Sequence, residues 1–190
     1  SMVNKMSKRI LTLDGTTLTS SEVVEVATHF SQVKIAEESM IRVRNARAVV
    51  DRILEDNEIV YGINTGFGSL VNTQINSEEL ETLQLNLIRS HATGLGDLMS
   101  IEEVRAMMCV RINSLVKGNS GCHPDVIHQL VTFLNMGIHP IVPRIGSLGA
   151  SGDLAPLSHL ALGLIGEGTV LFNNEERNAK DVLMECELLP

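Results

Sequence analysis

Apolar residues recur every three or four positions along most of the chain, with polar residues between them. This period is typical of amphipathic helices, and its longest run covers residues 34–55. Further helices are predicted where a polar residue or a proline precedes such a run, over residues 22–31, 76–92, 100–117, 124–137 and 153–166. The starts at Asn76 and Ser100 are capping boxes, because a glutamate follows three residues later. The pattern therefore predicts a mainly α-helical protein.

A few short stretches depart from the helical pattern. Residues 10–13 are apolar and run into an Asp-Gly pair, which predicts a short β element or a turn. Two prolines bracket an extended stretch over residues 140–143. Residues 169–172 predict one strand of a hairpin that turns at Asn173-Asn174. The last segment, residues 181–189, is predicted to start as a helix or a loop.

Glycines crowd together over residues 61–69 and again over residues 146–152. The first cluster lacks the Gly-Lys-Ser/Thr end of a phosphate-binding P-loop and the strand that precedes a dinucleotide site. Phosphate binding is therefore disfavoured there. The simplest structural interpretation of both clusters is that glycine satisfies turns with positive φ between helices.

Composition narrows the function classes. The 190 residues are 44% hydrophobic, enough for a packed core, and carry a net charge of −8. Negative charge and an aromatic content of 3% argue against a nucleic-acid or anionic-membrane partner. Three cysteines do not make a disulfide framework, and no apolar run approaches the roughly 18–20 residues that span a bilayer. We expect a cytoplasmic protein.

The second glycine cluster contains a tripeptide with chemistry of its own, Ala150-Ser151-Gly152. In a sharply bent backbone the amide nitrogen of Gly152 can attack the carbonyl carbon of Ala150, because neither residue has a bulky side chain. Ring closure with loss of water gives an imidazolone, and loss of the Ser151 hydroxyl as a second water leaves a methylidene group. The product is an electrophile. A helix that begins near Asp153 would stabilise negative charge beside it.

Several longer motifs resemble the aromatic amino acid ammonia-lyase and aminomutase family. The motifs are GSLGASGDLAPLSH at residues 146–159, YGINTGFG at 61–68, NLIRSHATGLG at 86–96, RINSLVKG at 111–118 and GEG at 166–168. They occur in the order typical of the family. The resemblance implies an all-α fold of the aspartase/fumarase-like kind, with a few short β elements and two glycine-rich active-site loops.

The resemblance also implies roles for individual residues. Family members build a methylidene-imidazolone cofactor from the tripeptide that is Ala150-Ser151-Gly152 here, and they use neither a metal nor a nucleotide. The residue matching Tyr61 removes the β-proton of the substrate. Because a free tyrosine has a pKa near 10, a positive environment would be needed for this role. Tyr61 is the only tyrosine in the chain.

Ser90 and His91 occupy the positions that lie beside the aromatic ring of the substrate in the family. Histidases carry Ser-His there, and so do some bacterial tyrosine aminomutases. A neutral histidine can hydrogen-bond either an imidazole or a phenol. The resemblance therefore favours histidine ammonia-lyase activity, with a tyrosine ammonia-lyase or tyrosine 2,3-aminomutase as the alternative. Leu148, where many histidases have valine, departs from the histidase pattern.

The length of the chain indicates its expected domain organisation. Family subunits have about 500 residues, so residues 1–190 are expected to form a single N-terminal domain that carries the catalytic loops of a larger subunit. The resemblance implies a homotetramer of full-length subunits, with further substrate-binding residues in the C-terminal helical part. An alternative of another class is a catalytically inert fragment that acts only in folding or subunit association.

His123 and His128 lie five residues apart, which is poor spacing for a metal site.

Overall fold

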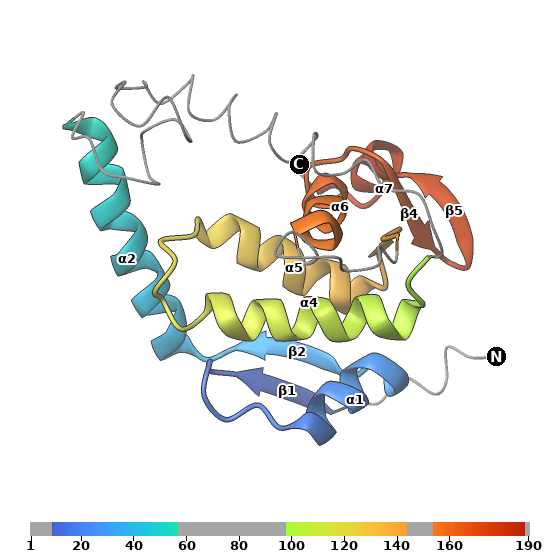
Figure 1. The fold of residues 1–190 in the computed structure, drawn as a ribbon, viewed down its shortest axis with the longest axis horizontal. Helices are drawn as coiled ribbons and strands as arrows, with labels where there is room; N and C mark the ends of the chain where they lie inside the picture. The colour runs from blue at the N-terminus through green and yellow to red at the C-terminus, as the bar shows by residue number, and fades with distance from the viewer. Residues whose placement is uncertain (1–8, 57–97, 144–153, 189–190) are drawn as a thin grey trace.

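The computed structural model describes residues 9–56, 98–143 and 154–188 (Figure 1). Within them the chain is mainly helical, as the sequence predicts, with five short strands. The helix predicted over residues 76–92 lies outside the described residues. No helix in the described part of the chain combines the length and the apolar character needed to cross a membrane.

The first unit is a strand–helix–strand crossover. Strand β1 (Ile10–Leu13) pairs in parallel with β2 (Gln32–Ile35), and helix α1 (Ser20–His29) connects them. The predicted β element at residues 10–13 is thereby confirmed. Helix α1 starts two residues earlier than predicted, because Thr19 caps it in a capping box with Glu22.

The prediction of one helix over residues 34–55 is wrong at its start. Lys34 and Ile35 belong to strand β2, and helix α2 (Glu37–Glu55) begins after them. Pairing with β1 continues to the end of the strand, where the Ala36 amide donates to the Leu13 carbonyl at 2.9 Å. The apolar spacing of this segment fits a helix locally, but hydrogen bonds to a strand distant in sequence decide its conformation.

The central helices follow their predicted caps. Helix α4 (Ile101–Leu115) begins with the Ser100–Glu103 capping box, and α5 (Pro124–Met136) has proline in its first turn. Helix α5 ends at Gly137, whose φ of +73° is the left-handed conformation that favours glycine.

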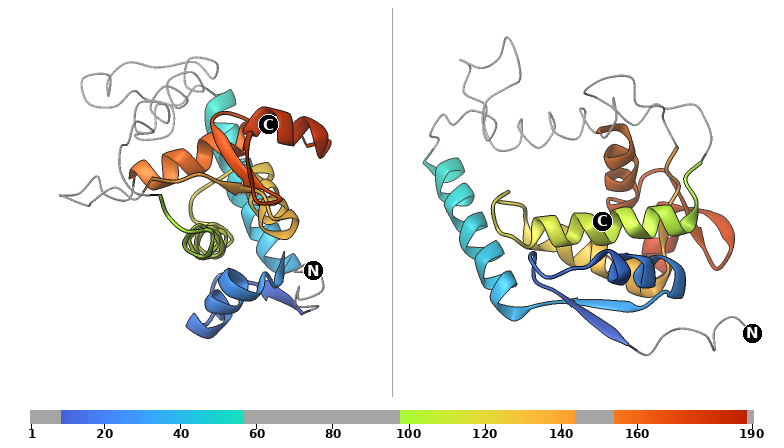
Figure 2. Two further views of the ribbon diagram at one scale, coloured as in Figure 1. Left: turned by 90° about the vertical axis from the view of Figure 1, so that its right-hand side faces the viewer. Right: turned by 60° about the horizontal axis from the view of Figure 1, so that its bottom comes forward.

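Helix α4 lies at the centre of the fold, with α1 on one side and α5 on another (Figure 2). Its inward face contributes fully buried side chains to one continuous core. The largest contributions of α4 and α5 to that core are Met108, Ile112, Ile127, Leu130, Phe133 and Leu134. Removing this apolar surface from water stabilises the packing of the two helices.

The C-terminal part combines a small sheet with two helices. Strand β3 (His139–Pro140) pairs antiparallel with β4 (Thr169–Phe172), which pairs with β5 (Glu175–Asn178). The predicted hairpin turn at Asn173-Asn174 is confirmed, because both residues have positive φ, at 51° and 63°. Helices α6 (Leu154–Leu164) and α7 (Ala179–Glu185) complete this part.

A side chain of α5 closes the open edge of the N-terminal sheet. The amide of Asn135 accepts a hydrogen bond from the Val33 N–H and donates one to the Val33 carbonyl, both at 2.9 Å. Both backbone groups of Val33 are therefore satisfied on the side of β2 that faces away from β1. This contact fixes the N-terminal sheet against α5.

Candidate active site

The residues singled out as catalytic or substrate-binding all lie outside the described residues. They are Tyr61, Ser90, His91, Ala150, Ser151 and Gly152. They fall in two segments, residues 57–97 and 144–153. The structure describes the residues that follow the first segment and those that flank the second, and these residues meet in one region.

The chain leaving the first segment pairs with the chain entering the second. Leu98 and Pro143 form an isolated antiparallel bridge, and the Met99 amide donates to the Val142 carbonyl at 2.8 Å. The end of the segment that contains His91 is thereby joined to the start of the segment that contains the Ala-Ser-Gly tripeptide. Nothing in the local sequence predicts this pairing.

The helix that follows the second segment packs against the same strand through its last turn. Gly163 of α6 lies so close to Pro140 of β3 that an added Cβ would come within 2.7 Å of the Pro140 Cγ. Only glycine allows this approach. Strand β3 is therefore in contact with α6, the helix that follows the tripeptide, and it also leads directly into Val142 and Pro143.

Helix α6 begins at Leu154, in agreement with the helix predicted to begin near Asp153. Its end is close to the predicted one, since Gly166 has a φ of +80° and the Glu167 amide donates to the Leu162 carbonyl at 2.8 Å. The first turn of a helix has free N–H groups and a partial positive charge. These groups follow the Ala-Ser-Gly tripeptide directly in the sequence.

A cavity of about 400 Å³ lies against this first turn. It is lined by Pro156 and Leu157 of α6, and otherwise by Met99, Met107, Val110, Arg111 and Ser114. Its size is within the range of small-molecule sites, and its lining is mostly apolar. Met99, which pairs with Val142, also contributes to its wall.

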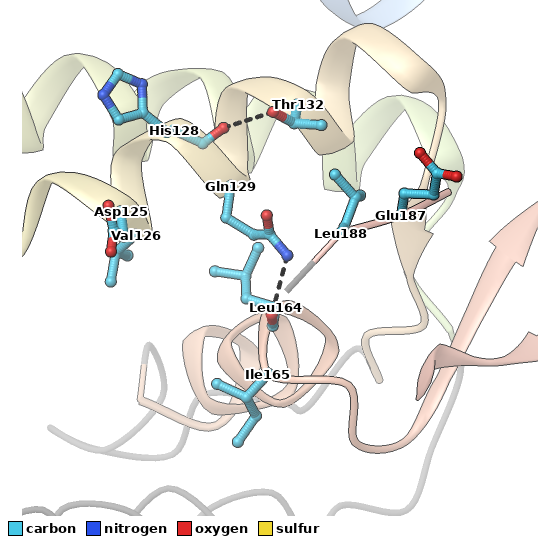
Figure 3. Close-up of a pocket in the computed structure, with 9 residues that line it drawn as sticks. All are labelled: Asp125, Val126, His128, Gln129, Thr132, Leu164, Ile165, Glu187 and Leu188. Atoms are coloured by element: carbon cyan, nitrogen blue, oxygen red, sulfur yellow. Dashed lines mark hydrogen bonds between the residues drawn. The ribbon is translucent and has the colours of Figure 1, made fainter. Parts of the chain in front are cut away.

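A larger cavity, of about 500 Å³, lies at the opposite end of α6 (Figure 3). Its wall combines the outer face of α5 with Leu164, Ile165, Glu187 and Leu188. The Gln129 side chain donates to the Leu164 carbonyl across it at 3.3 Å. Because this cavity adjoins the end of α6 and not its first turn, we do not assign the predicted chemistry to it.

Comparison with known proteins connects this geometry to a family. The family model for aromatic amino acid lyases matches residues 18–190. The chain belongs to the aromatic amino acid lyase family. Its mainly helical fold is the one found in solved members of that family.

Individual relatives of this aromatic amino acid lyase chain differ in substrate. It is 50% identical to a histidine ammonia-lyase of Staphylococcus aureus over 95% of the chain, and the match covers 36% of that relative. The structure of histidine ammonia-lyase from Trypanosoma cruzi matches 96% of the chain with a TM-score of 0.88 at 40% identity, covering 36% of that protein. A tyrosine aminomutase from Streptomyces globisporus matches 96% of the chain with a TM-score of 0.87 at 40% identity, covering 34% of that protein.

The lyase chain contains a buried cationic cluster that the sequence did not indicate. Arg105 of α4 has an exposed fraction of 0%. Its Nε donates to the Val26 carbonyl at 2.8 Å, and its Nη1 lies 2.9 Å from the Leu134 carbonyl and 3.0 Å from Nε2 of His139. The Phe30 ring centroid lies 4.3 Å from the Arg105 Cζ. Since arginine only donates, Nε2 of His139 is the acceptor.

Burial controls the protonation of this cluster. Burial and the adjacent charge of Arg105 lower the pKa of His139 to about 3, so the ring is neutral near pH 7. Burial also lowers the pKa of Arg105, to about 10, which leaves the guanidinium charged. Burial raises the pKa of the neighbouring Cys109 thiol to about 11, which keeps the thiol protonated and unreactive.

The other described histidines occupy separate places in this lyase chain. His123 caps α5, its ring Nδ1 accepting from the Asp125 amide at 3.1 Å. Nε2 of His159 in α6 is buried and makes no hydrogen bond within the described residues, and burial lowers the pKa of this ring. No three histidine, cysteine, aspartate or glutamate side chains in residues 9–56, 98–143 and 154–188 are grouped to hold a metal ion.

Proposed function

We propose that this chain is part of an ammonia-lyase that converts L-histidine into urocanate and ammonia. The observation that carries the proposal is the 50% identity to a histidine ammonia-lyase over 95% of the chain. The Ser90-His91 pair supports it, because a neutral histidine can exchange a hydrogen bond with the imidazole of the substrate.

The described residues on either side of residues 144–153 support a cofactor made from Ala150, Ser151 and Gly152. The residues before this tripeptide are paired with Met99, and the helix after it packs on Pro140. Fixed ends reduce the number of conformations that the intervening backbone samples, which favours a bend that brings two backbone groups together. Once formed, a methylidene-imidazolone supplies an electron-poor carbon that activates the amino acid for loss of ammonia.

The chain's own residues then have distinct tasks. Tyr61 takes the β-proton of the substrate on its phenolate oxygen, which requires a positive environment that lowers the tyrosine pKa. Ser90 and His91 bind the polar aromatic ring. The N–H groups in the first turn of α6 favour negative charge in the segment that precedes the helix.

A second candidate is a tyrosine ammonia-lyase or tyrosine 2,3-aminomutase. It is supported by the TM-score of 0.87 to the tyrosine aminomutase over 96% of the chain. His91 suits this substrate as well, because it can hydrogen-bond a phenol. An aminomutase returns ammonia to the β-carbon, whereas a lyase releases it.

The chain spans 36% of the length of the histidine ammonia-lyase relatives it matches. We therefore propose that it forms an N-terminal catalytic-loop domain and that turnover needs full-length subunits assembled as a cytoplasmic homotetramer. On this proposal the 190-residue chain alone is inactive. A contrasting proposal, in which the chain is an inert fragment that acts only in folding or subunit association, predicts no activity in any assembly.

Two measurements test the proposal. The first is the intact mass of the purified chain, in which a deficit of two water molecules, mapped to the peptide that holds Ala150-Ser151-Gly152, would support formation of the cofactor by this chain alone. Ser151→Ala should remove the part of this deficit that comes from the serine hydroxyl. An unmodified wild-type mass would show that this chain alone does not form the cofactor.

Activity of the full-length subunit decides the substrate. L-histidine should be turned over to an unsaturated acid with release of ammonia, and L-tyrosine should not. Release of a β-amino acid from tyrosine would favour the aminomutase. His91→Phe should shift the preference toward phenylalanine, and an unchanged preference would remove His91 from substrate recognition.

A further inference from the structure

The cavity of about 500 Å³ at the end of α6 has walls from three parts of the chain (Figure 3). The outer face of α5 forms one wall, the end of α6 forms another, and Glu187 and Leu188 form the third. The Gln129 side chain connects the first two walls, because it donates to the Leu164 carbonyl at 3.3 Å. The cavity is therefore a built feature of the packed fold.

Apolar side chains line much of this cavity although water reaches them. Val126 of α5 is 40% exposed, and Ile165 and Leu188 are only partly buried. On the opposite face of the same helix, Ile127 and Leu130 are buried in the core. Helix α5 is thus packed on one face and open on the other. Covering the apolar surface of its open face would release water and stabilise whatever binds there.

The charged groups at this cavity are acidic. Among the described residues that line it, Asp125 and Glu187 are acidic and none is lysine or arginine. The last carbonyls of α6, including that of Leu164, add partial negative charge, because helix C-termini carry it. The lining therefore matches an occupant with an apolar surface and a lysine or arginine at its edge.

The third wall identifies the occupant. Leu188 is held in place by its amide, which donates to the Leu183 carbonyl of α7 at 2.8 Å. The chain spans 36% of the length of its histidine ammonia-lyase relatives. In a full-length subunit that continues beyond residue 190, the next residues start beside this cavity. A segment tethered so closely has an effective concentration on the order of millimolar, so it binds in preference to a separate partner of similar affinity.

We propose that this cavity is the docking site for the part of the full-length subunit that follows residue 190. An apolar stretch of that part contacts Val126, Ile165 and Leu188, and a basic side chain beside it faces Glu187. This inference rests on the proposed function, because it needs the chain to be the N-terminal part of a longer subunit. It needs neither formation of the cofactor nor turnover of histidine.

A photocrosslinking residue at position 126 tests the proposal in the full-length subunit. Irradiation of the Val126→benzoylphenylalanine variant should join this position to a peptide from beyond residue 190, in a product with the mass of one subunit. The control is the same group at Val24 of α1, which is 57% exposed and does not line this cavity, and it should not give that peptide. A product with the mass of two subunits would assign the cavity to an interface between copies and overturn the proposal, as would the absence of any crosslink.

The second readout is the rate at which a thiol reagent modifies Val126→Cys, with the modified peptide identified by mass spectrometry. The rate should be about tenfold lower or more in the full-length subunit than in the 190-residue chain, whereas the rate for Val24→Cys should be the same in both. Equal rates for Val126→Cys would overturn the proposal. If the 190-residue chain alone does not fold, Val24→Cys also reacts faster in it, and the crosslink then decides.

Glu187→Lys tests the basic contact. In the full-length subunit it should raise the modification rate of Val126→Cys several-fold, and an unchanged rate would contradict a basic side chain at this edge. Loss of histidine turnover or of the two-water deficit would count against the proposed function alone, because neither measurement enters these readouts.

Discussion

Gly163 of α6 and Pro140 of β3 are in such close contact that a Cβ on the glycine would lie 2.7 Å from one proline ring carbon and 2.9 Å from another. The contact is backbone against a rigid ring, so neither side can move away by changing a rotamer. It sets the distance between the helix that follows the tripeptide and the strand that leads to it.

Gly163→Ala should therefore destabilise the protein although alanine is the better helix former. The expected loss is about 1–3 kcal/mol in the free energy of unfolding, typical of an overpacked core. Urea denaturation followed by circular dichroism measures it. A stabilised variant would mean that α6 does not pack on β3 this closely.

Pro140→Ala provides the matched control for that prediction. It removes the ring atoms that an alanine at position 163 would meet. The double variant should be more stable than the sum of the two single changes indicates, by a coupling of about 1 kcal/mol or more. Additive losses would show that the two residues do not interact.

Asn135→Ala should loosen the N-terminal sheet. It leaves the N–H and carbonyl of Val33, which is 2% exposed, without the partners they have at 2.9 Å. The expected loss in unfolding free energy is about 2 kcal/mol or more. Thr132→Ala on the same helix is the control, because among the described residues the Thr132 hydroxyl bonds the carbonyl of His128 in its own helix. A loss no larger than that of the control would contradict the double hydrogen bond.

The buried His139 ring predicts a pH dependence of stability. Its pKa is about 3 in the folded protein against 6.5 for a free histidine, so the unfolded chain binds the proton more readily. Above pH 6.5 this ring does not lower the free energy of unfolding. As the pH falls from 6.5 toward 3 the free energy of unfolding decreases, by about 2 kcal/mol between pH 7 and pH 5. Urea midpoints measured across that range check the slope.

His139→Phe should remove most of that slope, whatever its effect on stability at pH 7. A small slope of the same sign should remain, because burial also lowers the pKa of His159. Hydrogen bonds from Thr16 and Thr17 lower the pKa of the Asp14 carboxyl from 3.8 to about 2. Asp14 therefore changes the free energy of unfolding mainly below pH 3.8, outside the range from pH 7 to pH 5. An undiminished slope between pH 7 and pH 5 would assign the effect to another group.

Tyr61→Phe and Ser151→Ala should separate cofactor formation from turnover in the full-length subunit. Tyr61→Phe removes the proposed base, so kcat should fall about 100-fold or more while the mass deficit of two waters stays. Ser151→Ala should abolish both the complete deficit and the activity. Normal turnover by Tyr61→Phe would assign the proton transfer to a different residue.

Local signals predicted most of the fold. The Ser100–Glu103 capping box, the first-turn proline of α5 and the Asn173-Asn174 turn each specify their structure through neighbouring residues, and all three are confirmed. Strand β2 was missed because its residues also fit the helical spacing of the segment that follows. Its conformation depends on β1, more than twenty residues earlier, which no local pattern reports.

For the candidate site too, the sequence predicts some features and not others. Motifs alone predict Tyr61, His91 and the Ala-Ser-Gly tripeptide as site residues, and the structure does not describe these residues. The Leu98–Pro143 bridge and the partners of Arg105 arise from tertiary contacts and could not be predicted. One signal for Arg105 was available, since it interrupts the apolar stripe of its helix between Val104 and Met108.

The guanidinium of Arg105 also constrains the order in which the chain can fold. Its acceptors belong to two helices, at Val26 and Leu134, and to His139 beyond them. A partly folded chain that buried α4 before both helix ends were in place would enclose an unpaired charge, which is strongly unfavourable. Compact intermediates that lack α1 or α5 are therefore selected against, and the described core should form in a single cooperative transition.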